Sequence, residues 1–238
     1  MPFELDHIFI LTDAGADSSA ARLAALGGGG GLTEGATNTH PGQGTACRRF
    51  FFGNFYIELL WVSDAAEAQS DLVRPTYLFE RWSGRGDGRT SPFGIALRPG
   101  RGANAAPAPL PFETRPYRPP YLPASSSEGN CIHVAASSHL VTEPLVFYIP
   151  FAARPDSQPP PSARRQPLDH AAGLREIAPL TLTTPHADPH SDALGFLATS
   201  GLLNLRTGPA HLLELGFDHE PRGRATDLRP DLPLVLRW

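Results

Sequence analysis

The chain has 238 residues, of which 41% are hydrophobic and 18% charged, a balance typical of a folded globular protein with ample material for a core. Its formal net charge is −4, and it has no basic run of the kind that follows a phosphate backbone, so we expect no nucleic-acid partner. All 20 cationic residues are Arg. Because Lys is missing, lysine Schiff-base and P-loop chemistry are excluded.

Cysteine usage and hydropathy narrow the class further. Cys47 and Cys131 lie in separate apolar runs without CxxC spacing, so neither a disulfide framework nor a zinc cluster of cysteines is predicted. The first residues do not resemble a signal peptide, and no apolar run approaches membrane-spanning length. We therefore expect no membrane partner and a cytoplasmic location.

The apolar pattern predicts many strands and few helices. In chain order, the predicted strands are 3–11, 32–38, 47–52, 55–62, 92–98, 112–120, 131–136, 145–151, 174–184, 202–206, 211–217 and 231–238. The predicted helices are 20–26, 76–82 and about 192–199. Prolines restrict 112–120 to the edge of a sheet, and the Pro-rich stretch 154–166 is predicted as a loop.

The stretch 47–62 predicts a hairpin of two apolar strands around a Gly-Asn turn, where Gly supplies the positive φ of a tight turn. Alternation places Tyr56, Glu58 and Leu60 on one face of the second strand. Glu58 is the lone charge on that face, and a buried carboxylate is costly without a cation, a metal ion or several donors. Two interpretations stay open: an edge position or an ion pair with Arg, and a metal ligand or catalytic carboxylate inside a cavity.

Glu214 has a similar local setting. The second half of the chain repeats the order strand, helix, hairpin, strand, and residues 203–215 align with 49–59 after a small adjustment at the turn. Glu58 and Glu214 then coincide on the second arm of a hairpin. A carboxylate that is merely exposed at the surface need not recur at the same place in both halves. Two carboxylates that face a shared cleft would be expected to recur in this way. The repeat therefore favours a functional role, and we predict Glu58 and Glu214 as catalytic residues.

Several motifs, taken in their order and spacing, resemble the vicinal oxygen chelate superfamily and in particular its glyoxalase-like members. They are the opening Leu5-Asp6-His7-Ile8, the βαβββ order, Gly44-Thr45 before the third strand, and Tyr56-Ile57-Glu58-Leu59 in the fourth. The resemblance covers residues 3–62 well and about 174–238 more loosely.

The resemblance implies an α+β fold in which two βαβββ modules with curled mixed sheets enclose a cleft. We expect the first module at 1–65 and a second, shorter module at 171–238. Residues 66–170 are then intervening strands and Pro-rich loops, all within one compact unit.

The resemblance also implies a divalent metal ion, held by a His on the first strand and a Glu on the fourth strand of each module. His7 and Glu58 match these positions in the first module, and Glu214 matches in the second, whose first strand has no His. The expected metal ligands are therefore His7, Glu58 and Glu214. One His with two carboxylates favours Fe²⁺, Mn²⁺, Zn²⁺ or Ni²⁺ over Ca²⁺.

Other candidates have simpler interpretations. His40 lies in a predicted loop, within reach of a ligand, and is interpreted as exposed. Arg48 and Arg49 precede the hairpin turn; one could pair with Glu58 and the other bind an acidic group of a substrate, but a solvated strand end explains both. The tripeptide 168–170 repeats the opening Leu-Asp-His and is treated as a coincidence.

Three functional hypotheses follow, in order of preference. The first is a metal-dependent lyase, isomerase or dioxygenase acting on a small oxygenated metabolite. The second is a metal-free protein of the same fold that binds or sequesters a small molecule. The third is an interaction protein that uses the Pro-rich middle. The expected partner is a small molecule, in a cleft formed within one chain or across a homodimer.

Overall fold

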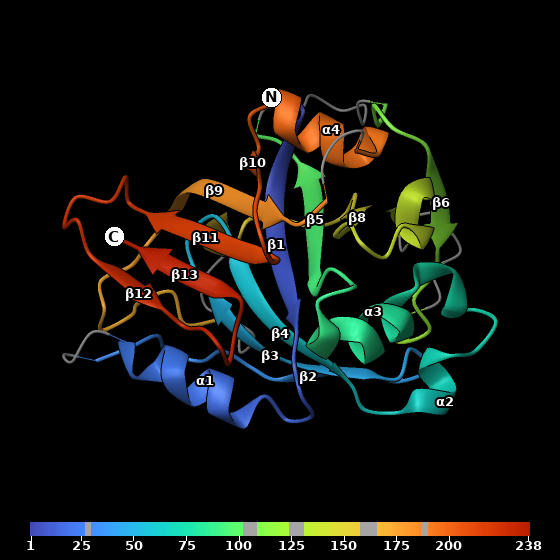
Figure 1. The fold of residues 1–238 in the computed structure, drawn as a ribbon, viewed down its shortest axis with the longest axis horizontal. Helices are drawn as coiled ribbons and strands as arrows, with labels where there is room; N and C mark the ends of the chain where they lie inside the picture. The colour runs from blue at the N-terminus through green and yellow to red at the C-terminus, as the bar shows by residue number, and fades with distance from the viewer. Residues whose placement is uncertain (27–29, 102–108, 124–130, 158–165, 187–189) are drawn as a thin grey trace.

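The computed structural model describes residues 1–26, 30–101, 109–123, 131–157, 166–186 and 190–238 (Figure 1). Eight strands form one mixed sheet in the spatial order β2 (Asn38–His40), β3 (Thr45–Phe51), β4 (Tyr56–Val62), β1 (Phe3–Leu11), β5 (Phe93–Pro99), β8 (Leu145–Tyr148), β7 (Ile132–Ala135), β6 (Thr114–Tyr117). Five form a second sheet in the order β10 (Asn204–Thr207), β9 (Ile177–Thr184), β11 (Leu212–Phe217), β13 (Leu234–Arg237), β12 (Ala225–Asp227).

The helices are short and lie at the edges of the sheets (Figure 1). They are α1 (Asp17–Ala24), α2 (Ala65–Ala68), α3 (Leu78–Gly84) and α4 (Asp192–Thr199). Short 3-10 helices span Arg74–Thr76, Arg85–Asp87, Ala136–His139 and Pro155–Ser157. Local capping explains two of the starts, because the Asp64 carboxylate accepts the first free N–H groups of α2 and the Ser191 hydroxyl accepts one from α4.

The eight-stranded sheet has an internal twofold pattern. In its first half β1 runs parallel to β4, and β3 and β2 follow antiparallel. The second half repeats this with β5 parallel to β8 and then β7 and β6 antiparallel. The antiparallel pair of β1 and β5 joins the halves. This is the predicted glyoxalase-like α+β arrangement of two modules, and the predicted fold class is confirmed.

The second half of that sheet corrects the expected location of the repeat. It is built by residues 93–148, which we expected to be intervening strands and loops, whereas residues 177–237 form the separate sheet. The predicted hairpin of 202–206 with 211–217 is wrong, since β9 lies between β10 and β11. The crossover through α4 carries β10 to one edge of β9, in parallel, and β11 returns antiparallel along the other edge.

A smaller correction concerns the predicted strand 32–38, of which only the last residue joins β2. The backbone N–H groups of this segment bond elsewhere: Leu32 to the Leu23 carbonyl at 2.9 Å, and Thr33 to Nδ1 of His170, also at 2.9 Å. His170 Nε2 contacts the Phe51 carbonyl at 2.8 Å. The second Leu-Asp-His therefore carries a histidine that links chain segments.

Both faces of the eight-stranded sheet are apolar, and they have different partners. Ile8 and Ile57 on one face belong to the main core, which also contains Leu182 and Leu213 of the second sheet. Phe9 on the opposite face belongs to a second apolar cluster. Burying each such side chain stabilises the fold by roughly 1.5–3 kcal/mol. The residues 171–238 thus cover the back of the large sheet and leave its other face for a cleft.

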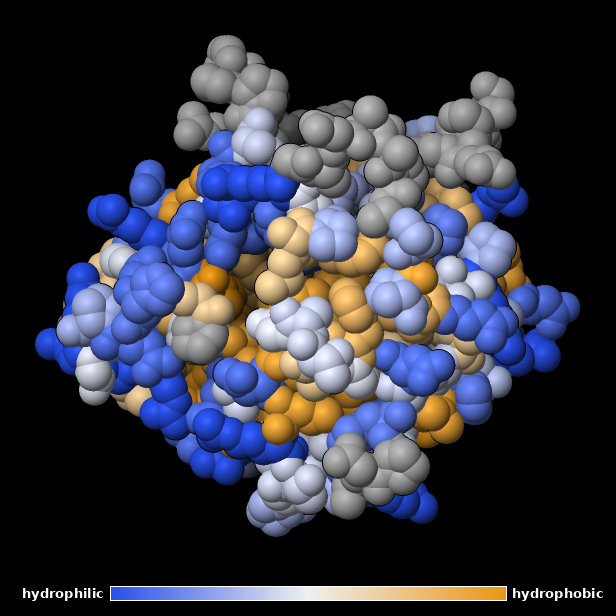
Figure 2. Space-filling view, turned by 90° about the horizontal axis from the view of Figure 1, so that it is seen from above, coloured by the Kyte–Doolittle hydropathy of each residue, from blue (hydrophilic) through white to orange (hydrophobic). Residues whose placement is uncertain are grey.

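The surface nearest α4 has separate apolar and hydrophilic areas. Apolar residues gather in the middle of this face, and hydrophilic residues flank them (Figure 2). Within the described ranges, no helix is both long and apolar enough to cross a membrane.

The stability of the fold is expected to depend on pH through His211, which lies just before β11. Its ring is 8% exposed and lies 6.0 Å from that of His186 between centroids. Burial and the neighbouring imidazole lower the pKa of His211 to about 4. Because the unfolded chain binds the proton near pH 6.5, the native state is favoured above that pH and loses stability as pH falls toward 4.

We expect a loss of about 1–3 kcal/mol between pH 7 and pH 4 from this group. The variant His211→Leu should flatten that part of the stability profile, measured as urea unfolding midpoints across the range. His139→Leu, at an exposed position, is the matched control and should leave the profile unchanged. Equal pH profiles for the wild type and His211→Leu would contradict the prediction.

Candidate functional site

A cavity of about 190 Å³ opens on the face of the eight-stranded sheet that the second sheet leaves free. The first module supplies most of its polar lining: His7, Asn38, His40, Gln43, Arg49 and Glu58. The second module supplies an apolar wall: Ile132, Val134, Leu145, Phe147 and Ile149. A dry cavity of about 150 Å³ holds one benzene molecule, so this one suits a ligand of about one substituted ring.

His7 is positioned by its own neighbour in β1. The register with β5 shifts between Leu5 and His7, which releases Asp6 from strict alternation. Both side chains are buried, and Oδ2 of Asp6 lies 2.7 Å from Nδ1 of His7. This contact fixes the imidazole and leaves Nε2 free to face the cavity.

Arg98 of β5 holds Asp6 in turn. Its side chain is only 2% exposed, and its guanidinium donates to Oδ1 of Asp6 at 3.3 Å, to Glu4 at 2.9 Å and to the Asn54 carbonyl at 2.9 Å. The chain Arg98, Asp6, His7 therefore runs from the centre of the sheet to the cavity. Such connected buried polar groups hold one orientation when their partners are present.

The free nitrogen of His7 points toward the predicted carboxylate. Nε2 lies 3.7 Å from Oε2 of Glu58, which is 7% exposed. The imidazole stacks on Tyr56 at 4.2 Å and meets the edge of Phe147 at 5.5 Å between ring centroids. The structure thus brings His7 and Glu58 together, on the face of β4 that alternation predicted.

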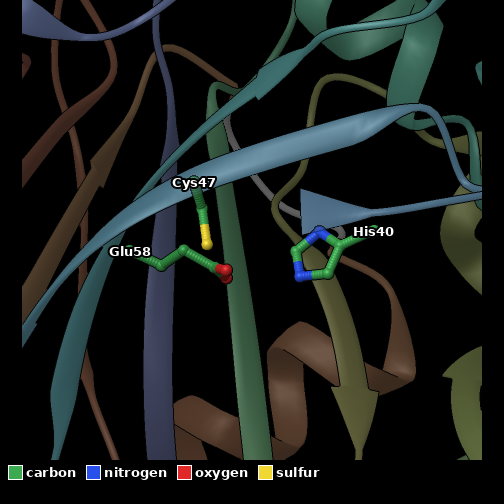
Figure 3. A group of neighbouring side chains, drawn as sticks. All are labelled: His40, Cys47 and Glu58. Atoms are coloured by element: carbon green, nitrogen blue, oxygen red, sulfur yellow. The ribbon is translucent and has the colours of Figure 1, made fainter. Parts of the chain in front are cut away.

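Two further side chains converge on Glu58 from the neighbouring strands (Figure 3). One nitrogen of His40 in β2, the sulfur of Cys47 in β3 and one carboxylate oxygen of Glu58 in β4 all lie within 4.8 Å of one another, and all three residues are buried. The sulfur of Cys47 and the carboxylate of Glu58 are therefore close neighbours. Burial and this neighbouring carboxylate raise the pKa of Cys47 far above its ordinary value.

His40 is held by a polar network of its own. Nδ1 lies 2.9 Å from the Thr45 hydroxyl, and Nε2 lies 3.1 Å from the amide nitrogen of Asn38. Gln43 donates to the same hydroxyl at 2.8 Å and accepts from Tyr117 at 2.8 Å. Burial lowers the pKa of His40, although the Glu58 carboxylate acts in the opposite direction. The interpretation of His40 as exposed was therefore wrong.

Glu214 lies elsewhere. It sits on β11 in the second sheet, where its carboxylate pairs with Arg237 at 2.5 Å and lies 3.7 Å from Arg206. It lines a separate surface hollow with these two arginines. The structure does not bring Glu214 to His7 and Glu58, because the hairpin repeat that aligned the two glutamates does not exist. The expectation that these three residues share one ion is corrected accordingly.

The arginines before the hairpin turn also have other partners. Arg48 bonds to Glu34 at 2.6–2.7 Å and to Asp17 at 2.7 Å. Arg49 donates to the Ala36 carbonyl at 3.0 Å and lies over the ring of Phe51. In the described structure neither guanidinium forms an ion pair with Glu58, although Arg49 lines the cavity beside it.

The second module does not repeat the polar group. Its strands equivalent to β1 and β4 are β5 and β8, with the sequences FGIALRP and LVFY. Neither contains a His or a Glu. The ligands that the resemblance implies for the second module are therefore not supplied by these strands, and the apolar wall takes their place.

The two-module sheet, with a His on its first strand facing a Glu on its fourth, is the arrangement that the resemblance to glyoxalase-like proteins implied. Residues 5–117, from β1 to β6, match the family model described as a glyoxalase-like domain. Over these residues the predicted resemblance to the glyoxalase-like members of the vicinal oxygen chelate superfamily is confirmed.

Other comparisons say less about the site. No curated protein matches the sequence. Among solved structures, the chain is similar to a hypothetical protein from Staphylococcus aureus, with 9% sequence identity, a TM-score of 0.46, and coverage of 99% of this chain and 98% of that one.

Proposed function

We propose that the protein is an enzyme that acts on a small oxygenated molecule in this cleft, with a divalent metal ion bound through His7 and Glu58. The observation that carries the proposal is the 3.7 Å approach of Nε2 of His7 to Oε2 of Glu58, with Nδ1 already held by Asp6. Bonds of roughly 2.0–2.2 Å from each atom to one ion are compatible with that separation. A metal-binding His commonly donates its other nitrogen to a carboxylate, as His7 does.

Some residues of the pocket would take part in the reaction, and others would only enclose the substrate. When bound, the ion would supply a Lewis acid that polarises a substrate oxygen. Glu58 is placed to accept a proton from the substrate and return it, and the Asp6 contact keeps His7 in one orientation. Tyr56 and Phe147 exclude water on either side of the imidazole. These elements would suit a lyase, an isomerase or a dioxygenase.

The shape of the cavity supports a compact ligand with an apolar part. Its oxygen atoms would face the first module, where the polar side chains lie, and its carbon skeleton would face Val134 and Leu145. Both modules of one chain line the cavity, so the pocket has both its polar and its apolar side without a second copy.

Metal content of the purified protein, beside that of the variant Glu58→Gln, tests the proposal. We expect about one transition-metal ion per chain in the wild type, and its loss in Glu58→Gln with an unchanged circular dichroism spectrum, because the amide cannot replace the ionised carboxylate. Glu214→Gln is the matched control and should keep the metal, since Glu214 lies in the other sheet. A wild-type protein without metal, even after incubation with Zn²⁺, Mn²⁺, Fe²⁺ and Ni²⁺, would refute the proposal.

The alternative is a metal-free binding protein on the same fold. The observation in its favour is the absence of His and Glu from β5 and β8, so that the strands β5, β7 and β8 bring only apolar side chains to the cavity. This function predicts tight binding of a small molecule without turnover. It also predicts that His7→Ala retains binding, whereas the enzyme requires His7.

A further inference from the structure

In the part of the chain that the structure describes, a set of metal-ligating side chains lies within the first module. His40, Cys47 and Glu58 come from three adjacent strands and meet at one point beside the cavity (Figure 3). All three are buried. Glu58 is a buried carboxylate without an arginine partner in the described structure, and such a group is costly unless a cation or several donors compensate it.

We propose that Glu58, Cys47 and His40 form a site for a zinc-type divalent ion, made within the first module, in place of the ligands that the second module does not supply. This inference rests on the proposed metal-dependent function and names the ligands that complete its site. The set contains one thiolate, one imidazole and one carboxylate, which together favour Zn²⁺ or Co²⁺ over Mg²⁺ and Ca²⁺.

The contacts of His40 and Cys47 bear on this role. The hydroxyl of Thr45 lies 2.9 Å from Nδ1 of His40, and the amide nitrogen of Asn38 lies 3.1 Å from Nε2; on binding, the ion would replace Asn38 as the partner of the Nε2 lone pair. The sulfur of Cys47 lies within 4.8 Å of a carboxylate oxygen of Glu58. On binding, the S–H bond breaks, a metal–sulfur bond forms from the sulfur lone pair, and the proton leaves to solvent.

His7 then binds the same ion, as the proposed function requires. Its Nε2 approaches the same glutamate from β1, on the side of the cavity. Four protein ligands fill a tetrahedral site, so a substrate oxygen would bind from the cavity by expansion to five-coordination. The buried thiolate makes the site different in its spectrum and metal preference from one built of His and Glu alone.

Titration of the chelator-treated protein with Co²⁺ tests the inference, because a thiolate ligand gives a sulfur-to-cobalt charge-transfer band in the near ultraviolet. We expect one Co²⁺ per chain with that band, displaced by Zn²⁺. Cys47→Ser should lose the band and bind at least about tenfold more weakly, and His40→Gln should weaken binding by a similar factor. Cys131→Ser is the matched control, since Cys131 is also a buried free cysteine. It should keep both the band and the affinity.

The variant Cys131→Ser also keeps the inference testable if Cys47→Ser fails to fold. In Cys131→Ser the only remaining cysteine is Cys47, so the band in that protein assigns the thiolate without any change at the site. Cobalt binding without the band in the wild type, lost in Glu58→Gln, would place the ion on His7 and Glu58; the inference would then be overturned and the proposed function kept. The absence of any Co²⁺ or Zn²⁺ binding by the wild type would overturn both.

Discussion

The variant Arg98→Met is expected to lower the free energy of unfolding by about 3–5 kcal/mol. Arg98 is almost completely buried and its guanidinium bonds to Asp6, to Glu4 and to a backbone carbonyl. Met fills a similar volume but removes the charge, so the buried carboxylate of Asp6 loses its cationic partner. The penalty comes from that uncompensated charge more than from the lost attraction itself.

Chemical denaturation measures this effect, and two variants make it specific. Arg74→Met removes an exposed partner of Asp71 and should cost only about 0–1 kcal/mol. Adding Asp6→Asn to Arg98→Met should recover part of the stability, because the carboxylate that was left unpaired is then neutral. If Arg98→Met costs no more than Arg74→Met, Arg98 does not hold the buried network.

The variant Gly44→Ala should destabilise the protein by about 3–5 kcal/mol, the sum of two effects. Gly44 has φ +71°, which is strained for any residue with a Cβ. A Cβ there would also lie 2.2 Å from the Asp64 carbonyl oxygen and 2.6 Å from the Ala68 nitrogen. Both are backbone atoms at α2, so no side chain can rotate away.

Gly88→Ala separates the two effects, because Gly88 has φ +70° but open space around its Cα. It should cost about 1–2 kcal/mol from backbone strain alone. The difference in free energy of unfolding between Gly44→Ala and Gly88→Ala, measured by chemical denaturation, gives the cost of the overlap with α2. Because Thr45 follows Gly44 and holds His40, we also expect Gly44→Ala to weaken metal binding. Equal losses of stability in the two alanine variants would show that the structure accommodates the extra Cβ at Gly44 at little cost in free energy, which would contradict the prediction.

The first half of the fold was predictable because its signals are local. The hairpin of β3 and β4 follows from two apolar strands and a two-residue turn, and Glu58 faces the cavity as alternation requires. The same turn fixes the cross-strand register that pairs Cys47 with Leu60. The sequence therefore contained the signal that Cys47 and Glu58 share a face as diagonal neighbours, a relation between two strands that CxxC spacing does not describe.

Other parts of the site depend on long-range pairing. Asp6 reaches His7 only because of an irregularity in the ladder with β5, and Arg98 arrives from that same strand. Neither contact has a local sequence pattern. The assignment of Glu214 failed for a related reason: two strands close in sequence were assumed to pair, although the crossover through α4 placed β9 between them.

The pairing of β1 with β5 joins the two modules into one continuous sheet, so two separate stretches of sequence line one cavity. Residues before position 63 provide the ionisable groups around His7 and Glu58, and residues 132–149 provide the apolar wall. A substitution at Val134 or Leu145 reshapes the space for a ligand without touching any hydrogen bond of the charged groups. Reactivity and ligand choice can thus evolve independently in this chain, one point mutation at a time.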